Sequence, residues 1–106
     1  MAEPRVRVPS MARQGEIIEI KTVVSHAMDT GHSRDVYGKL IPRYIIHTFT
    51  CTYNGAEVFR ADWHPAIAAH PYLAFSTVAM ESGRLRFEWI DDKGTVYATE
   101  AEITVV

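Results

Sequence analysis

The sequence predicts an all-β fold, an immunoglobulin-like antiparallel β-sandwich of about seven strands. Apolar and polar residues alternate in many short segments, as they do in strands that bury one face. Turn signals such as Asn54-Gly55 separate these segments. Helical periodicity is nearly absent, whereas a parallel sheet would require crossover helices. The resemblance to immunoglobulin domains is one of architecture only, because the cysteine pair of antibody domains is missing.

The expected strands follow one another in chain order. Pro9 ends the first, and a β-branched run forms the second. The third places Phe49 and Cys51 on one face and Ile46 and Thr48 on the other. The fourth pairs with the third as a hairpin, and the last three alternate clearly between turn signals rich in Gly, Ser and Asp. Their ranges are 5–8, 16–24, 44–53, 58–63, 73–80, 84–89 and 95–105.

Length and composition are those of one soluble domain that spans residues 1–106. Apolar residues make up 47% of the chain, and no apolar run is long enough to cross a membrane. The formal net charge is −2 and no basic cluster stands out, so nucleic acid is not an expected partner. The best helix candidate is a short turn around Ala66 to Ala69, between two prolines.

One connection, from Ser25 to Arg43, is long for a compact β domain. Long loops on rigid sandwiches are often functional, although such a loop can also pack along a sheet edge. Met28 and Tyr37 lie within it, and both residue types are common in interfaces. They are expected either to face a partner or to fold back onto the core.

Cys51, the single cysteine, is the obvious candidate nucleophile, but its predicted face favours burial as an inert side chain. The histidines lack the paired spacing of a zinc site, and Asp62 with His64 is better explained by a salt link or surface placement. Motifs of hydrolases, phosphate-binding loops and calcium loops are not found. The sequence therefore predicts no enzyme, no metal site and no cofactor.

Several ordered segments of the chain form a distinctive set. They are His26-Ala27-Met28-Asp29-Thr30-Gly31, Leu40-Ile41-Pro42-Arg43, Phe49-Thr50-Cys51-Thr52-Tyr53-Asn54-Gly55, Glu57-Val58-Phe59, Ala61-Asp62 and Pro65-Ala66-Ile67-Ala68-Ala69-His70-Pro71-Tyr72. Together these segments resemble the SoxZ family. The resemblance extends from about Val6 to the carboxyl end, and Asp29, where Glu is expected, is a small departure.

The resemblance implies a role in bacterial thiosulfate oxidation. SoxZ-family proteins pair with SoxY, and the heterodimer carries sulfur intermediates on a cysteine in the glycine-rich carboxyl-terminal arm of SoxY. The family is expected to bind no substrate covalently and to dock to the other Sox enzymes. The resemblance also implies that the chain reaches the periplasm folded, together with its signal-bearing partner. Residues 1–9 contain no apolar signal segment, which agrees with the family's expected lack of its own export signal.

The candidate partner-interface residues lie in the long loop and in the segment from Trp63 to Tyr72. They are His26, Met28, Thr30, Gly31, Arg34, Trp63 and Tyr72. Two alternatives remain open at this point. One is a thiol carrier or enzyme that uses Cys51, and the other is a generic immunoglobulin-like binding module of an unrelated assembly.

Overall fold

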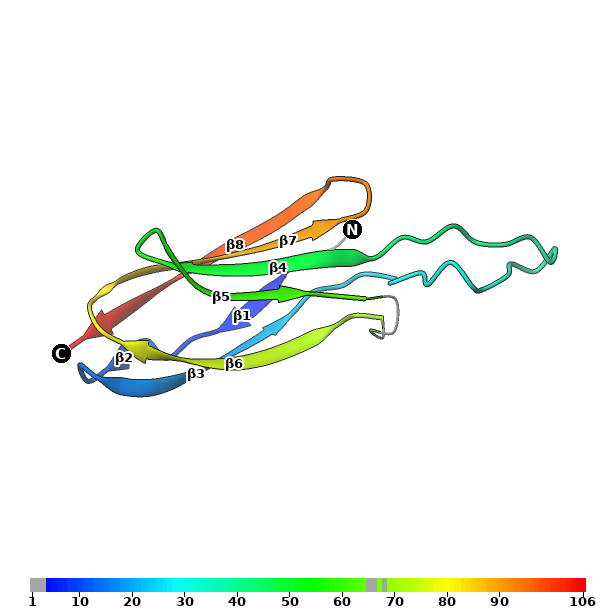
Figure 1. Cartoon of the computed structure of the whole chain (residues 1–106). Helices are drawn as coiled ribbons and strands as arrows, with labels where there is room; N and C mark the ends of the chain where they lie inside the picture. Colours follow the sequence, from blue (N-terminus) through cyan, green and yellow to red (C-terminus); the bar gives the residue numbers. More distant parts are fainter. Residues whose placement is uncertain (1–3, 65–66, 68) are drawn as a thin grey trace.

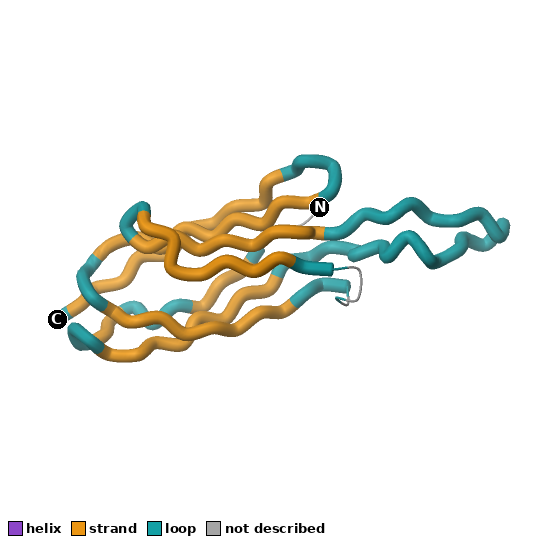
Figure 2. Tube along the Cα trace, viewed as in Figure 1, coloured by secondary structure: helices purple, strands orange, loops and turns teal. Residues whose placement is uncertain are grey.

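The strands of this chain form two sheets that face each other (Figure 1, Figure 2). The structure is a computed structural model that describes residues 4–64, 67 and 69–106. Its strands are β1 (Arg5–Arg7), β2 (Met11–Ala12), β3 (Glu16–Val23), β4 (Ile46–Tyr53), β5 (Ala56–Asp62), β6 (Tyr72–Ala79), β7 (Gly83–Asp91) and β8 (Val96–Val105). The smaller sheet has the order β1-β3-β6 and the larger one β2-β8-β7-β4-β5. The predicted β-sandwich is confirmed.

Aromatic side chains fill the space between the sheets. Phe59 of β5 stacks on Phe75 of β6, with ring centroids 4.3 Å apart and planes 11° apart. The ring centroid of Phe49 lies 5.9 Å from that of Phe75 and 5.0 Å from that of Trp89. Phe49, Phe87 and Trp89 are fully buried. Large aromatic rings dominate the burial energy of a core, and here Phe49 of β4 and Phe59 of β5 both contact Phe75 across the two sheets.

The hairpin between β4 and β5 turns at the predicted position. Asn54 and Gly55 have φ values of 49° and 85°, and Tyr53 pairs with Ala56 across the turn. A two-residue turn with both central residues at positive φ matches the twist of the flanking strands. The Asn-Gly pair therefore sets the register of this hairpin.

The structure contains one strand that was not predicted, β2. It runs parallel to β8, with Met11 opposite Thr104 and Ala12 opposite Val105, so the sandwich is not wholly antiparallel. A two-residue strand is too short to show alternation, which explains why the sequence pattern missed it.

The predicted faces of β4 are wrong at its first residues. Ile46 and Thr48 are buried, although alternation placed them on the solvent-facing side of the strand, the side away from Phe49. The register between β4 and β7 shifts between Ile46 and Thr48, as at a β-bulge. An extra residue in one strand turns the following side chains to the other face.

The predicted helical turn lies partly outside the described residues, because Ala66 and Ala68 are not among them. Within residues 4–64, 67 and 69–106, no helix has the length and apolar character needed to cross a membrane.

Residues 24–45, between β3 and β4, project beyond the sandwich as two irregular, roughly antiparallel segments (Figure 1, cyan to green). We call them the ribbon. Asp29 pairs with Tyr44 at its base, and Arg34 pairs with Leu40 near its end. The ribbon accounts for the elongated shape of the molecule, whose principal extents are 58 × 21 × 20 Å. The long connection predicted from the sequence is thus an extended, paired structure that leaves the sheet edge.

Candidate partner-binding site at the ribbon

The end of the ribbon, residues 34–40, is a hydrogen-bonded turn that we call the tip. The Asp35 carboxylate accepts hydrogen bonds from the backbone N–H groups of Tyr37 at 2.9 Å and Lys39 at 3.0 Å. The Asp35 carbonyl accepts from the Gly38 N–H at 3.0 Å, and Arg34 donates to the Gly38 carbonyl at 2.9 Å. These contacts give the tip a defined conformation without help from the sandwich.

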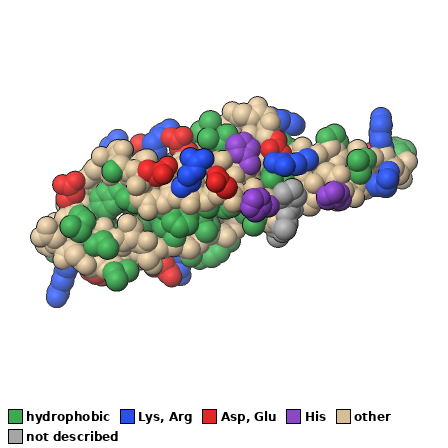
Figure 3. Space-filling view, viewed as in Figure 1, with side chains coloured by type: hydrophobic (Ala, Val, Ile, Leu, Met, Phe, Trp, Pro, Cys, Tyr) green, Lys and Arg blue, Asp and Glu red, His purple; other side chains and the backbone are tan. Residues whose placement is uncertain are grey.

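The tip exposes apolar side chains. Val36 is 93% exposed, Tyr37 91% and Leu40 51%. Figure 3 shows hydrophobic and basic side chains together on the ribbon. The tip extends too far from the sandwich to pack against it (Figure 1). An ordered turn that leaves an aromatic and two aliphatic side chains in solvent is typical of a protein-binding surface.

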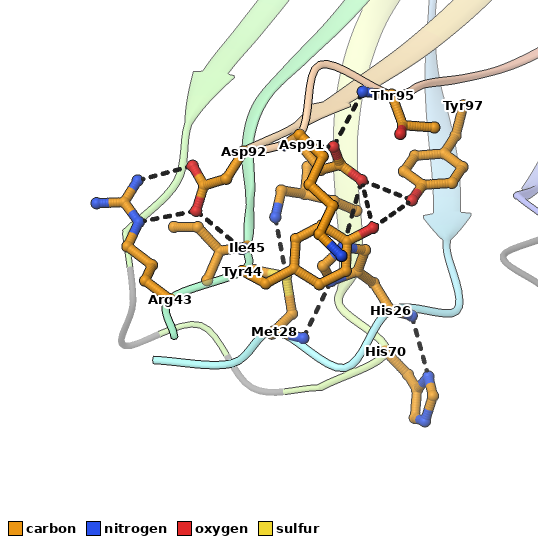
Figure 4. Close-up of polar contacts among 12 residues, drawn as sticks. His26, Met28, Arg43, Tyr44, Ile45, His70, Asp91, Asp92, Thr95 and Tyr97 are labelled. Atoms are coloured by element: carbon orange, nitrogen blue, oxygen red, sulfur yellow. Dashed lines mark hydrogen bonds and ion pairs between the residues drawn. The ribbon is translucent and has the colours of Figure 1, made fainter. Parts of the chain in front are cut away.

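At the base of the ribbon, a buried carboxylate gathers hydrogen bonds from several elements (Figure 4). Oδ2 of Asp91 accepts hydrogen bonds from the hydroxyl groups of Tyr97 at 2.6 Å and Tyr44 at 2.8 Å. Oδ1 accepts from the backbone N–H groups of Lys93 at 2.9 Å and Thr95 at 3.0 Å. One side chain thereby ties the ribbon, through Tyr44, to the β7–β8 turn and to β8.

The protonation states of this cluster follow from the same contacts. Burial alone would raise the pKa of Asp91, but hydrogen bonds from Tyr97, Tyr44 and the two backbone amides outweigh it and lower the pKa. Burial and the hydrogen bond to Asp91 raise the pKa of Tyr97 above its usual range. At neutral pH the cluster is therefore one carboxylate held by two neutral phenols.

His26 packs beside this cluster. Its Nδ1 accepts a hydrogen bond from the Met28 N–H at 3.0 Å, which places the proton of the neutral ring on Nε2. Nε2 lies 3.7 Å from Oδ2 of Asp91 and, among the described residues, has no hydrogen-bond partner. The imidazole also packs on the ring of Tyr44, with centroids 4.5 Å apart. His26 thus fills the space beneath the ribbon.

Met28 and His70 both have positive φ values, and each forms a hydrogen bond that holds the base of the ribbon. Met28 has a φ of 53°, its side chain is buried, and its Sδ accepts a hydrogen bond from the Ile46 N–H at 3.3 Å. His70 has a φ of 52°, and its N–H donates to the His26 carbonyl at 2.8 Å. Positive φ is costly for residues other than Gly and is retained where the surroundings fix it. The ribbon base is therefore held by packing on both sides.

A second anchor lies on the outer side of the base. Arg43 donates two hydrogen bonds to Asp92, one from Nε to Oδ2 at 2.9 Å and one from Nη2 to Oδ1 at 3.1 Å. The Ile45 N–H donates to the same carboxylate at 3.1 Å. Burial would raise the pKa of Asp92, but the hydrogen bonds from Arg43 and Ile45 lower it. Gly31, at a φ of 87°, lies against Arg43, and a Cβ added there would be 3.2 Å from the Arg43 Cβ. The two anchors fix the direction in which the ribbon leaves the sandwich.

The structure separates the predicted interface residues into two groups. Arg34 and Tyr72 are exposed, and Thr30 and Gly31 are partly exposed. His26, Met28 and Trp63 are buried within the chain, so any role of theirs at a partner surface would be to support the exposed residues around them, and the interface itself stays a prediction.

Trp63 is buried because it packs on Phe49, with the two rings nearly parallel and their centroids 6.3 Å apart. Met28 folds back onto the core, one of the two alternatives expected for it. Tyr37 does not fold back onto the core and is exposed, so its contact with a partner stays a prediction.

The sequence matches a known family over most of its length. Residues 6–102 match the model of the family described as Sulphur oxidation protein SoxZ. This chain belongs to the SoxZ family. The assignment confirms the resemblance of the sequence segments and places the chain in the Sox sulfur-oxidation system. No curated protein sequence matches it.

Solved structures share the fold of this SoxZ-family chain at low identity. A superoxide reductase (neelaredoxin) from Ignicoccus hospitalis has a TM-score of 0.72 and 15% identity, covering 98% of this chain and 80% of that one. The sulfur carrier protein SoxY from Chlorobium limicola f thiosulfatophilum has a TM-score of 0.68 and 13% identity, covering 97% of this chain and 78% of that one. These likenesses establish the β-sandwich. Within the described part of the chain, no group of three or more His, Cys, Asp or Glu side chains is placed to bind a metal ion.

Cys51 of this SoxZ-family chain is placed as the sequence predicts. It is fully buried in β4, and burial raises the pKa of its thiol to about 12. Because the thiolate is the nucleophile, a buried thiol with this pKa is inert at neutral pH. This result opposes a thiol carrier or enzyme that uses Cys51.

Sequence reasoning missed Asp91 and its two tyrosines. It assigned Asp91 and Asp92 to a plain hairpin turn and placed Tyr97 on the same strand face as Ile103, whereas the structure has Asp91 as the last residue of β7 and only Asp92 in the turn. No local pattern shows that Tyr44, far away in the chain, meets the same carboxylate. The one available signal was a tyrosine at an inward position beside an acidic turn, since buried tyrosine hydroxyls generally require a partner.

Proposed function

We propose that this chain is the non-catalytic subunit of a sulfur-carrier heterodimer with SoxY in thiosulfate oxidation. The ribbon is the observation that carries this proposal. Its tip is ordered, its exposed apolar side chains find no partner on the described part of the chain, and its base is fixed by Asp91 and Asp92. A projecting element of this kind is suited to contact a second protein.

Burial of the tip would contribute favourably to the free energy of binding. Full burial of a side chain such as that of Val36, Tyr37 or Leu40 contributes about 1.5–3 kcal/mol. Because the tip already has its turn conformation, little further entropy is lost when it binds. We therefore infer that the tip packs against SoxY as a preformed anchor.

The division of labour between the subunits follows from Cys51. With its only thiol buried, this chain has no group suited to form a sulfur adduct at neutral pH. The proposal assigns the sulfur-bearing cysteine to the carboxyl-terminal arm of SoxY. This chain then supports that arm and offers docking surface to the enzymes that load, oxidise and unload it.

The place of action we propose is the periplasm, reached folded and together with SoxY. Family membership supports it. Cell fractionation tests it directly, because the chain should appear in the periplasm when SoxY is co-expressed with its export signal. Retention of the chain in the cytoplasm under those conditions would contradict this part of the proposal.

Analytical ultracentrifugation of the purified chain mixed with purified SoxY tests the heterodimer. The expected result is a 1:1 complex at micromolar concentration, with thiosulfate-derived adducts found by mass spectrometry on SoxY alone. Two species that sediment independently, or an adduct on Cys51, would overturn the proposal.

A further inference from the structure

A groove on the outer side of the smaller sheet has no role in the account above. It has a volume of about 350 Å³. Its lining comes from β1, β3 and the first residue of β6, and consists of Arg5, Val6, Arg7, Lys21, Thr22, Val23 and Tyr72. Tyr72, one of the predicted interface residues, is 61% exposed at this groove.

The charge of the groove is opposite to that of the chain. Among the residues that the structure describes, its lining contains three cationic side chains and no carboxylate, although the chain has a formal net charge of −2. Lys21 lies 3.6 Å from Glu19, outside the lining. Among the described residues, Arg7 forms no ion pair, so the groove keeps a local positive potential.

Two of these cations lie opposite each other on neighbouring strands, and their repulsion lowers the stability of the fold. Arg7 and Lys21 are directly opposite in the antiparallel pairing of β1 with β3. Like charges at such positions destabilise a sheet, typically by a few tenths of a kcal/mol to about 1 kcal/mol. A pair kept at a cost to folding indicates that the cations are used for something other than stability.

The outer face of the larger sheet shows the contrasting arrangement. Arg86 lies 2.8 Å from Glu88 and 3.6 Å from Glu100, and Arg84 lies 3.2 Å from Glu102. Figure 3 shows basic and acidic side chains next to one another over the sandwich. Charges in these ladders satisfy each other, whereas in the groove Lys21 has only its contact with Glu19 and Arg7 has no ion pair among the described residues.

We propose that this groove binds an extended acidic segment of a protein partner. Arg5 and Arg7 are two residues apart on one strand face, which separates them by roughly 6.5 Å. Acidic residues at alternate positions of an extended segment repeat at the same distance. Tyr72 and Val23 offer apolar surface to the stems of those side chains. The site is separate from the ribbon tip and goes beyond the contact proposed for SoxY.

Nuclear magnetic resonance of the full chain with the hexapeptide Glu-Ser-Glu-Ser-Glu-Ser as the probe tests this inference. We expect saturable amide shifts confined to residues 5–7, 21–23 and 72, which weaken as salt is added. The double variant Arg7→Glu with Lys21→Glu should weaken binding by about tenfold or more. The peptide Gln-Ser-Gln-Ser-Gln-Ser should not bind.

The control variant Arg13→Glu with Arg60→Glu changes the net charge equally at exposed positions away from the groove, and it should bind like the unmodified chain. Single Arg7→Gln should leave the urea midpoint of unfolding unchanged or raised, because it removes the like-charge pair across β1 and β3 and breaks no ion pair in the described part of the chain. A fall in that midpoint would assign the pair a structural role and overturn the proposal.

Three further outcomes would also overturn the proposal. The first is that the control variant loses as much affinity for the acidic hexapeptide as the groove variant does. The others are that the unmodified chain binds inorganic sulfate as tightly as the hexapeptide, or binds oligothymidine more tightly. SoxY affinity is a separate readout, since the groove variant keeps an intact ribbon. Loss of peptide binding with an unchanged SoxY complex supports the groove, whereas failure of the unmodified chain to bind SoxY counts only against the proposed function.

Discussion

The hydroxyl of Tyr97 donates a hydrogen bond of 2.6 Å to Oδ2 of Asp91, directly beneath the ribbon. The two residues lie on neighbouring strands, and the same carboxylate oxygen accepts a second hydrogen bond from Tyr44, which lies at the base of the ribbon. A contact inside the sandwich therefore controls the direction of a surface element. Changes at this cluster should reach the partner-binding surface without touching it.

Asp91→Ala should lower the free energy of unfolding by about 3 kcal/mol or more, because it leaves two buried hydroxyls and two backbone N–H groups without their acceptor. Urea unfolding, monitored by tryptophan fluorescence, measures this loss in the free energy of unfolding. Asp92→Ala is the matched control and should cost only about 1 kcal/mol, since the Arg43–Asp92 pair is partly exposed. Equal losses in the two variants would contradict the assigned role of Asp91.

The pH dependence of stability has a predictable sign. The pKa of Asp91 is lower in the folded chain than its usual value of about 4 in the unfolded chain. The stabilisation of the folded chain by the ionised Asp91 carboxylate is therefore fully present above about pH 4, and it is lost as the pH falls through the pKa of Asp91 in the folded chain. The stability difference between the unmodified chain and Asp91→Ala should shrink from pH 6 to pH 3 by urea titration. A difference that stays constant or grows would contradict this linkage.

Gly31→Ala should weaken SoxY binding, whereas Gly15→Ala, between β2 and β3 and away from the ribbon, should leave it unchanged. Both glycines have positive φ, so both substitutions carry a backbone cost of about 1 kcal/mol. Only at Gly31 does the new Cβ meet Arg43, 3.2 Å away, and disturb its pair with Asp92. Chemical shifts of the Arg43 side chain report this directly. An unshifted Arg43 signal in Gly31→Ala would show that the close contact relaxes elsewhere.

Cys51 should resist thiol reagents in the folded chain. With a pKa of about 12 and a fully buried side chain, it should react with a disulfide reagent at pH 8 only after unfolding in guanidinium. Ser76→Cys supplies the control, because position 76 is exposed and should be labelled at once. Cys51→Ala should leave sulfur loading of the SoxY complex unchanged. Rapid labelling of Cys51 in the native chain would revive the thiol-carrier alternative.

Much of the fold could be predicted because alternation is a local signal. Phe49, Cys51, Phe87 and Trp89 lie where a period of two places them, and Asn54-Gly55 turns as its chemistry requires. A two-residue strand and a register shift leave no such signal, so β2 and the bulge of β4 were missed.

The candidate site was predicted only in part, for a different reason. The length of the loop predicted that the loop is functional, but it did not predict which of its residues fold inward. Met28 and His26 turn back because they pack against Tyr44 and Ile46, which are distant in sequence. The exposed residues that the structure adds, Val36 and Leu40, look ordinary in the sequence because only the direction of the ribbon leaves them uncovered.

The affinity of the chain for SoxY, measured by isothermal titration calorimetry with tip variants, tests the central claim most directly. Val36→Ser with Tyr37→Ser should weaken binding by about 2 kcal/mol or more, roughly thirtyfold, because it removes the proposed anchor. Met11→Ser with Val96→Ser removes exposed apolar side chains from the sandwich and should bind as the unmodified chain does. Unchanged affinity in the tip variant, or an equal loss in both variants, would contradict the account.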